Sequence, residues 1–369
     1  MKPDATERHS LILPARLQMV AWEITRSCNL ACLHCRAASK SGPYEGEFST
    51  DRCLGLIDEI AEVGTPVVIL TGGEPYLRED IFRIAAYGNE KGLRMVLATN
   101  GTTVTDSIAE KTREAGIKRV SISIDGADAR GHDAFRGVPG AFEGACAGIE
   151  AFKRAGVEFQ INTTVTDRNI GEIDRITAFA EAIGAAGHHI FLLVPTGRGK
   201  DLAGQAIGAD DYERTLHWFY EKSLSSPLQL KATCAPQYYR IFRKRSTENG
   251  RREAPPSPLH SMTRGCMGGS SFCFISHVGQ VQPCGFLEID CGRLAEQSFS
   301  DIWHTSKIFA DLRNLAGYKG KCGRCEFIKI CGGCRARAWE ASGDYLAEEP
   351  LCAYEPKKRP APKIPPIEG

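Results

Sequence analysis

The chain has 369 residues, enough for two or three domains. Its 46 basic and 45 acidic residues leave a net charge of +1, which excludes a strongly basic nucleic-acid binder and an acidic disordered tail. No apolar run reaches the roughly 18 residues of a membrane span, and no signal peptide is visible at the start. We therefore expect a cytoplasmic protein without a membrane span, in monomeric form. Its 15 cysteines are too sparse for a disulfide scaffold, so metal-bound or free thiols are expected.

Residues 19–195 alternate short apolar segments with helical stretches. We predict strands at 19–24, 66–70, 93–98, 119–124, 158–165 and 188–194, and helices between them at 51–63, 80–91, 106–115, 141–155 and 170–183. Six such units in series predict a parallel sheet with right-handed crossovers. Because six units are too few to close an eight-fold barrel, the sequence predicts an α/β fold with a partial (β/α)6 barrel. Its ligands should bind at the carboxyl ends of the strands.

The expected organisation has four parts. An N-terminal extension covers 1–18, the barrel covers 19–229, a Cys-rich domain covers 230–356, and a mobile tail covers 357–369. A further helix is expected at 209–224 and a surface loop at 244–264. The Cys-rich part has weak periodicity and many glycines, so metal binding should help it to fold.

Three cysteines follow the first strand directly. Cys28, Cys32 and Cys35 form the spacing CxxxCxxC. Three thiolates with this spacing can bind three irons of one [4Fe–4S] cluster and leave the fourth iron open. A zinc site with His34 as the fourth ligand is the competing interpretation.

This spacing, on the loop after the first strand, resembles the signature of radical S-adenosylmethionine (SAM) enzymes. The resemblance implies that SAM chelates the open iron and is cleaved by one electron to methionine and a 5′-deoxyadenosyl radical. It also implies SAM contacts at later strand ends, with Arg136 as the candidate for the SAM carboxylate. The candidate SAM-binding residues are Gly72, Gly73, Glu74, Thr99, Asn100, Ser123, Asp125, Arg136 and Asn162.

Nine cysteines lie between positions 266 and 352. They resemble the SPASM extension of radical SAM enzymes, except that two rather than three residues separate Cys331 from Cys334. The resemblance implies two auxiliary [4Fe–4S] clusters, and zinc is again the competing metal. The implied ligands are Cys266, Cys273, Cys284 and Cys334 for one cluster, and Cys322, Cys325, Cys331 and Cys352 for the other.

Four cysteines are left outside these sets. Cys291 is an alternative to Cys273 as a ligand. Cys53 and Cys146 fall in predicted helices and are expected to be buried as small apolar residues. Cys234 is either a residue on the substrate side or simply a packed side chain.

Segments 22–28, 34–38, 194–199 and 331–337 resemble the haem-biosynthesis branch of this family, and the resemblance covers about 17–356. It is greatest to the haem synthases that convert two propionates of iron-coproporphyrin III to vinyls by oxidative decarboxylation, which gives haem b. This implies a reductant of the flavodoxin or ferredoxin type. The alternatives are a didecarboxysirohaem deacetylase, a haem d1 enzyme, a SPASM peptide or sulfatase maturase, and an electron carrier without chemistry of its own.

A porphyrin with four propionates requires cations. The candidates are Arg198, Lys200, Lys231 and Arg240, although a Gly-Arg-Gly-Lys turn is also typical of a solvated loop. His188 or His189 is a candidate ligand of the haem iron, with a buried or solvated histidine as the alternative.

Overall fold

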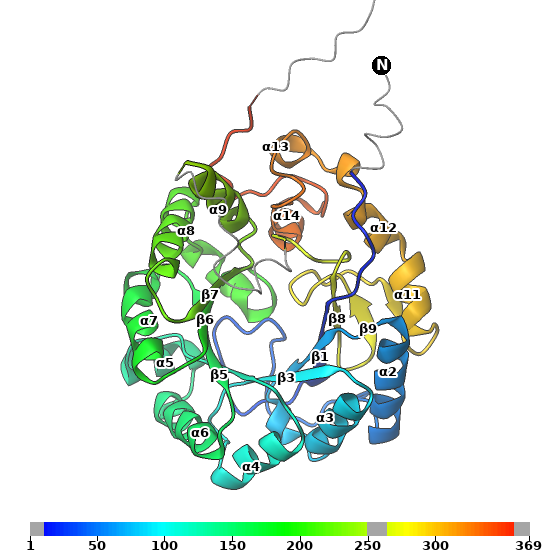
Figure 1. Cartoon of the computed structure of the whole chain (residues 1–369), viewed down its shortest axis with the longest axis vertical. Helices are drawn as coiled ribbons and strands as arrows, with labels where there is room; N and C mark the ends of the chain where they lie inside the picture. The colour runs from blue at the N-terminus through cyan, green and yellow to red at the C-terminus, as the bar shows by residue number, and fades with distance from the viewer. Residues whose placement is uncertain (1–10, 249–263, 358–369) are drawn as a thin grey trace, which may run out of the picture.

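The computed structural model describes residues 11–248 and 264–357 (Figure 1). Most of the expected N-terminal extension, most of the loop at 244–264 and nearly all of the tail lie outside these residues.

A ten-stranded sheet forms the frame of the molecule, in the order β10-β9-β8-β1-β2-β3-β4-β5-β6-β7. Strands β1 to β7 are parallel, and β8 pairs with β1 in parallel. The pairs β8–β9 and β9–β10 are antiparallel. The strands are β1 Met19–Thr25, β2 Val67–Gly72, β3 Arg94–Thr99, β4 Val120–Ser123, β5 Phe159–Val165, β6 Gly187–Leu192, β7 Gln229–Thr233, β8 Phe272–Ile275, β9 Gln280–Gln282 and β10 Gly292–Arg293.

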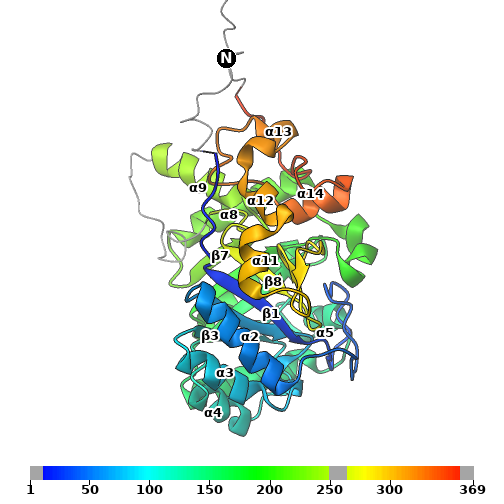
Figure 2. The same cartoon turned by 90° about the vertical axis from the view of Figure 1, so that its right-hand side faces the viewer.

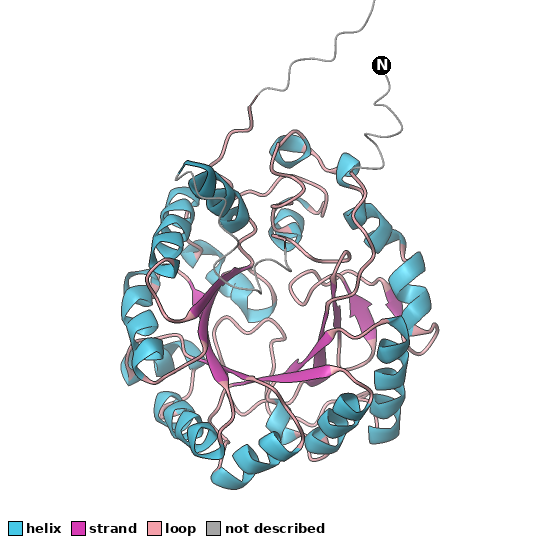
Figure 3. Cartoon of the chain, in the orientation of Figure 1, coloured by secondary structure: helices cyan, strands magenta, loops and turns pink. Residues whose placement is uncertain are grey.

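Helices cover the outer side of the curved sheet, which Figure 3 shows as a wall bent around the centre of the molecule. The helices around the barrel are α2 Thr50–Val63, α3 Ile81–Glu90, α4 Asp106–Glu114, α5 Ala129–Arg136, α6 Ala141–Ala155, α7 Ile173–Ala182, α8 Ala209–Ser223 and α9 Gln237–Glu248. The C-terminal helices are α11 Phe299–Thr305, α12 Lys307–Arg313, α13 Gly320–Gly323 and α14 Arg335–Ser342. Short 3-10 helices are η1 Pro75–Leu77, η2 Ile170–Glu172, η3 Gly197–Gln205 and η4 Leu315–Gly317. Figure 2 shows α12 to α14 toward the end of the molecule away from α3 and α4, whereas α11 lies nearer the middle and packs against α2.

The two faces of the barrel strands differ because successive side chains point to opposite sides. On the outer face, apolar residues such as Leu70 and Ile122 are fully buried against the helices. The inner face carries polar residues instead. On β5, β6 and β7, these are Asn162, His189 and Lys231, which are paired with one another in the register of the three strands. The alternation thus places a polar row on the concave wall of the barrel.

The predicted fold class is confirmed, and all six predicted strands are present with shifts of one or two residues at their ends. The sheet also extends further than expected. Strand β7 spans the boundary expected at 229/230, and β8 joins the Cys-rich segment to β1. The expectation of a loop from 244 was wrong for 244–248, which belong to α9.

Among the described residues, no helix has the length and apolar character needed to cross a membrane.

Candidate functional site

The loop that follows β1 holds the first three cysteines against the rest of the barrel. Cys28 and Cys32 are buried and Cys35 is half-buried. The backbone N–H of Ala31 donates to the carbonyl of Arg136, 3.2 Å away at the end of α5. On the other side, the N–H of Arg198 donates to the carbonyl of Cys35 at 3.0 Å. The loop is therefore fixed between α5 and the start of η3.

Each of these sulfur atoms has a hydrogen-bond donor close by. The N–H of Leu30 lies 3.4 Å from Cys28 Sγ, the N–H of Ser39 lies 3.4 Å from Cys35 Sγ, and Arg136 Nη1 lies 3.6 Å from Cys32 Sγ. Burial raises the pKa of the free Cys28 thiol to about 11, and the neighbouring Cys32 and Cys35 act in the same direction. Such a site binds a metal group readily because iron replaces the protons and the N–H donors stabilise the thiolates.

The first three thiols do not form a group that suits a single metal ion such as zinc. Within the described residues, no three His, Cys, Asp or Glu side chains are grouped so that they could hold one metal ion. Thiolates on one zinc ion lie roughly 4 Å apart, whereas in a cubane each thiolate binds its own iron. His34 stacks on Phe135 with ring centroids 4.5 Å apart, and its Nε2 lies 3.8 Å from Asp125.

The Gly72-Gly73-Glu74 segment lies directly against the start of the cluster loop. The N–H of Gly73 donates to the carbonyl of Thr25 and the N–H of Glu74 donates to the carbonyl of Ser27, both at 2.8 Å. A Cβ atom on Gly73 would lie 2.2 Å from the Ser27 carbonyl oxygen. Glycine is therefore required at position 73, because any side chain would push the segment away from the loop.

Glu74 connects β2 to the end of β3. Its carboxylate accepts hydrogen bonds from Thr99 Oγ1 at 2.8 Å and from the N–H of Asn100 at 2.7 Å. Burial raises the pKa of Glu74 to about 7, although these hydrogen bonds oppose the shift. Asn100 in turn donates to Asn29 Oδ1 at 2.9 Å, and its Nδ2 lies 3.9 Å from Cys28 Sγ. The structure thus brings the candidates on β2 and β3 together beside the first cluster loop.

Asp125 and Arg136 form a buried ion pair of 2.6 Å next to Cys32. Asp125 also accepts a hydrogen bond from the N–H of Thr164 at 2.7 Å. The charge of Asp125 holds the guanidinium of Arg136 protonated despite its burial, so its pKa is raised. Ser123 and Asn162 lie in register on β4 and β5. They therefore lie side by side on the barrel wall.

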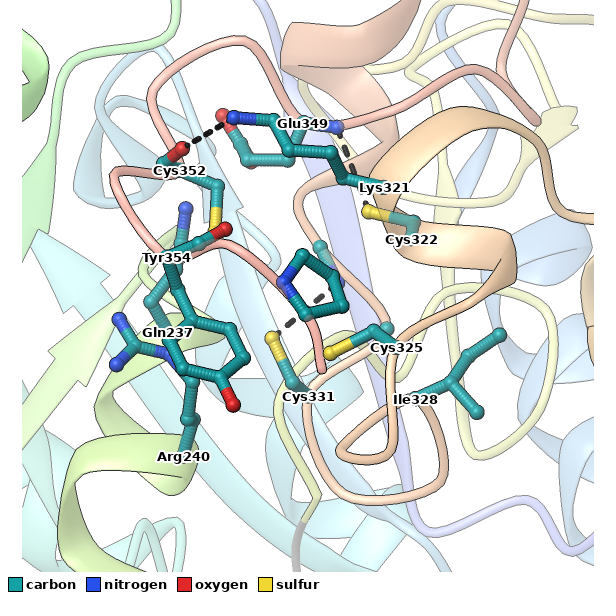
Figure 4. Close-up of a pocket in the computed structure, with 13 residues that line it drawn as sticks. Gln237, Arg240, Lys321, Cys322, Cys325, Ile328, Cys331, Glu349, Cys352 and Tyr354 are labelled. Atoms are coloured by element: carbon teal, nitrogen blue, oxygen red, sulfur yellow. Dashed lines mark hydrogen bonds between the residues drawn. The ribbon is translucent and has the colours of Figure 1, made fainter. Parts of the chain in front are cut away.

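Four C-terminal cysteines line one cavity, as Figure 4 shows: Cys322, Cys325, Cys331 and Cys352. Three of them accept backbone hydrogen bonds, with the N–H of Glu349 at 3.4 Å from Cys322, that of Phe327 at 3.4 Å from Cys325 and that of Gly333 at 3.5 Å from Cys331. The structure therefore brings together the whole set expected for the second auxiliary cluster.

The other expected set is brought together only in part. Cys284 and Cys334 lie in one small apolar cluster together with Leu287. Cys273 lies elsewhere, because it is in the middle of β8, is 0% exposed and belongs to the main core of the molecule. Its neighbouring thiol there is Cys291, so neither of the two candidates for this ligand position lies with Cys284 and Cys334.

The two cysteines expected in predicted helices both lie in helices. Cys53 in α2 is fully buried, and Cys146 in α6 is half-buried.

Three of the four cations predicted for the substrate lie in other surroundings. Arg198 donates through Nε to the carbonyl of Cys32 at 2.8 Å and braces the cluster loop. Lys200 is exposed and lies 3.8 Å from Glu340. Arg240 forms an ion pair of 2.6 Å with Glu213 and lines the cavity of the second auxiliary cluster. For these three residues, the positive charge is evident from the sequence, but the groups that each side chain contacts are evident only from the structure.

Lys231 differs from these three. It lies beside His189 in the register of β6 and β7, on the face opposite His188. Burial lowers its pKa to about 8, and no ion pair joins it to an acidic side chain within the described part of the chain. Lys231 therefore presents an ammonium group inside the barrel.

The two adjacent histidines of β6 lie on opposite faces. His188 is within 2.9 Å of Thr163 Oγ1 and 3.1 Å of Thr177 Oγ1, so both ring nitrogens are occupied between β5 and α7. Burial lowers its pKa to about 3 and keeps it neutral. His189 Nδ1 lies 2.9 Å from Gln160 on the concave wall. Of the two, His189 is the one that faces the barrel interior.

Arg337 is a residue of this region that sequence reasoning missed. It is buried, pairs with Glu349 at 2.9 Å, and donates to the carbonyls of Leu192 and Leu193 at the end of β6. It also donates to the carbonyl of Cys234. Arg337 thus links the auxiliary cysteines to the barrel. In the sequence, the feature that could have pointed to Arg337 is its position three residues after Cys334.

Comparison with known proteins accounts for this arrangement. The radical SAM superfamily model matches residues 22–180, and the SPASM iron-sulfur cluster-binding domain matches 266–335. The crystal structure of Streptococcus suis SuiB bound to precursor peptide SuiA has a TM-score of 0.73 at 16% identity and covers 95% of this chain and 79% of that chain. Native anSMEcpe with bound AdoMet and Cp18Cys peptide has a TM-score of 0.67 at 20% identity. The match covers 91% of this chain and 94% of that chain. These likenesses establish the fold.

Sequence relatives are much more similar. The AdoMet-dependent heme synthase of Nitratidesulfovibrio vulgaris is 54% identical, with 92% of this chain and 93% of that protein covered. The AdoMet-dependent heme synthase of Methanosarcina barkeri is 52% identical, with 93% and 98% covered. The Fe-coproporphyrin III synthase of the same organism is 31% identical, with 90% and 87% covered. The chain therefore belongs to the radical SAM enzymes with a SPASM domain, which use SAM and iron–sulfur clusters, and within them to the haem-biosynthesis branch that contains the AdoMet-dependent heme synthases.

Proposed function

We propose that the protein converts two propionates of iron-coproporphyrin III to vinyl groups by oxidative decarboxylation, which gives haem b. The chain is 54% identical to an AdoMet-dependent heme synthase, but only 31% identical to an Fe-coproporphyrin III synthase and to a pre-heme d1 synthase. This difference supports the heme synthase reaction over the reactions of the other two enzymes. The reductant of the first cluster is proposed to be a flavodoxin or ferredoxin.

The observation that carries the proposal is the ammonium group of Lys231 on the concave wall of the barrel. Lys231 is partly buried, and a cation withdrawn from water without an acidic partner is costly unless a ligand supplies the opposite charge. A propionate carboxylate is such a ligand, and pairing with it would raise the pKa of Lys231 again. His189 and Asn162 lie next to Lys231 on the neighbouring strands and offer further polar contacts to the same substrate.

When bound, the first cluster with SAM supplies a carbon-centred oxidant that can remove a hydrogen atom from an unactivated C–H bond. Cys28, Cys32 and Cys35 would hold that cluster, and Asp125 keeps Arg136 protonated and in place beside Cys32, where the guanidinium could donate to the SAM carboxylate. Gly73 and Glu74 keep β2 and β3 close to the loop. The protein thus positions the reactants.

The propionate loses a hydrogen atom from the methylene carbon next to the ring, its carboxylate leaves as carbon dioxide, and one electron leaves to an acceptor as the vinyl double bond forms. The acceptor is proposed to be an auxiliary cluster, because a [4Fe–4S] group accepts one electron at a time.

Mass spectrometry of the porphyrin tests the function. The anaerobically reconstituted protein is incubated with SAM, dithionite and iron-coproporphyrin III. We expect two successive losses, each equal to carbon dioxide plus two hydrogens. Loss of acetate arms from didecarboxysirohaem would instead identify the sister deacetylase reaction, and an unchanged porphyrin with SAM cleavage only on added peptide would identify a maturase.

A further inference from the structure

We propose that Cys234 is the fourth cysteine ligand of the first auxiliary cluster, together with Cys266, Cys284 and Cys334. Cys273 takes no part in it. This assignment concerns the cofactors of the protein and does not depend on which porphyrin is its substrate.

Cys234 lies where the barrel meets the C-terminal cysteines. It follows the last residue of β7, and its side chain packs in the same small apolar cluster as Cys284 and Cys334. Cys266 reaches the same place from the other side. Gly265, directly before it, lies so close to Pro236 that an added Cβ would be 2.8 Å from the proline Cβ. Four chain segments that are distant in sequence therefore present a thiol to one region.

Backbone contacts connect Cys266 to two of these segments. Its N–H donates to the carbonyl of Cys331 at 2.9 Å, three positions before Cys334. Two residues after Cys266, a Cβ atom on Gly268 would lie 3.1 Å from the carbonyl oxygen of Pro283, which directly precedes Cys284. The segments that carry the four thiols are therefore in contact with one another.

The backbone at Cys234 is held in an unusual conformation. Its φ of +55° is in the left-handed region, which residues with a Cβ rarely adopt. The carbonyl of Cys234 accepts hydrogen bonds from the hydroxyl of Tyr212 at 3.1 Å and from Arg337 Nη2. A strained residue persists when its surroundings fix it, and such residues occur mainly at functional sites. Here the strained residue places its thiol in the apolar cluster that also contains Cys284 and Cys334.

Cys273 cannot replace it without a rearrangement of the sheet. Its neighbours in register are on β1, where it lies opposite Val20, and its surroundings are the main core, Cys291 and Arg313. Four protein thiolates close all iron positions of a cubane. With Cys234 included, both auxiliary clusters are fully ligated, and the first cluster alone keeps an open iron.

The test compares Cys234→Ala with Cys273→Ala in the full-length protein, purified and reconstituted without oxygen. We expect iron to fall from about twelve to about eight atoms per chain in Cys234→Ala and to stay near twelve in Cys273→Ala. The electron paramagnetic resonance spectrum of the reduced protein should lose or change one auxiliary signal in the first variant only. Cys234→Ser, which nearly keeps the volume of the side chain, should behave as Cys234→Ala does.

Three outcomes would overturn the assignment. The first is full iron loading with an unchanged spectrum in either Cys234 variant. The second is the loss of about four irons in Cys273→Ala. The third is the loss of all irons and of the circular dichroism spectrum in both Cys234 variants, since that would make Cys234 a residue required for folding rather than a ligand of one cluster.

Discussion

Four consecutive residues at the start of η3 illustrate how differently neighbouring side chains can act. Gly197 has a φ of +53°, and a Cβ there would lie 2.1 Å from the carbonyl oxygen of Arg36. Arg198 reaches back to the carbonyls of Cys32 and Ser39, whereas Lys200 points to solvent near Glu340. A basic turn that resembles a substrate contact in the sequence is therefore partly a clamp on the first cluster loop.

Replacement of Arg198 by Ala should weaken the first cluster. The change removes two hydrogen bonds from a charged donor to loop carbonyls, each worth about 1.5–3 kcal/mol. We expect loss of up to about four irons per chain and at least a tenfold slower SAM cleavage. Lys200→Ala is the matched control, and both iron content and SAM cleavage should remain at the wild-type level. Full loading of Arg198→Ala would contradict the clamp.

Lys231 should make porphyrin binding sensitive to pH. Its lowered pKa of about 8 in the free protein means that the charged form is lost as the pH rises through 8. Affinity for iron-coproporphyrin III, measured by Soret titration, should therefore be constant below pH 7 and fall about tenfold per pH unit well above 8. Lys231→Arg should remove this dependence because an arginine stays charged. Lys231→Met should bind weakly at every pH, and an unchanged affinity in that variant would argue against a carboxylate partner.

In strand β6, the alternation of side chains between the two faces of the sheet gives two adjacent histidines different surroundings. His188 and His189 are adjacent in sequence, but the first joins β5 to α7 and the second lies on the concave wall. From the sequence both were equal candidates for a haem ligand. The pleat of the strand separates them, because neighbouring residues point to opposite faces.

A pair of alanine variants tests this division. His188→Ala removes two buried hydrogen bonds, so the free energy of unfolding should decrease by about 1–3 kcal/mol, with porphyrin affinity unchanged. His189→Ala should lower porphyrin affinity and have the smaller effect on stability. Thermal unfolding and Soret titration measure the two effects. The division would be refuted if His188→Ala weakened binding while the stability stayed the same.

Elements with a strong apolar pattern were predictable and those without it were not. The helix from Ala141 to Ala155 appears with the predicted bounds, and the strands of the barrel differ by one or two residues. Helices α5, α9 and α11 to α14 were not predicted, and residues 244–248 of α9 were expected to be a loop. These segments are short or highly charged, and contacts with the rest of the molecule rather than periodicity define them.

At the scale of the whole molecule, the pairing of β8 with β1 makes the barrel and the Cys-rich segment one continuous sheet. Arg337 joins the same two parts at the other side, through the carbonyls at the end of β6 and its ion pair with Glu349. This places the auxiliary clusters against the barrel. Such an arrangement suits electron transfer between the substrate and a cluster.

The double variant Cys322→Ala/Cys325→Ala tests the role of the auxiliary clusters in product formation. The first cluster keeps all its ligands, so SAM cleavage under strong reductant should continue within about twofold of the wild-type rate. Haem formation should stop, because the electron released with carbon dioxide lacks its acceptor. Chromatography of adenosine products and porphyrins from one reaction measures both. Normal haem yield would reject the acceptor role.

The sequence by itself determined the fold class and the position of the first cluster loop, because local features carry them: periodic apolar residues, and cysteines within a few positions of each other. The cofactors followed from the resemblance of these motifs to radical SAM enzymes. The resemblance to the SPASM family implied the set Cys322, Cys325, Cys331 and Cys352, and these four residues line one cavity. Only the tertiary structure decided that Lys231 rather than Arg198 or Arg240 faces the barrel interior, and that Cys234 rather than Cys273 lies with Cys284 and Cys334. The reason is that strand register and long-range packing, which determine where a side chain points, depend on the partners of a residue and not on its own position in the chain.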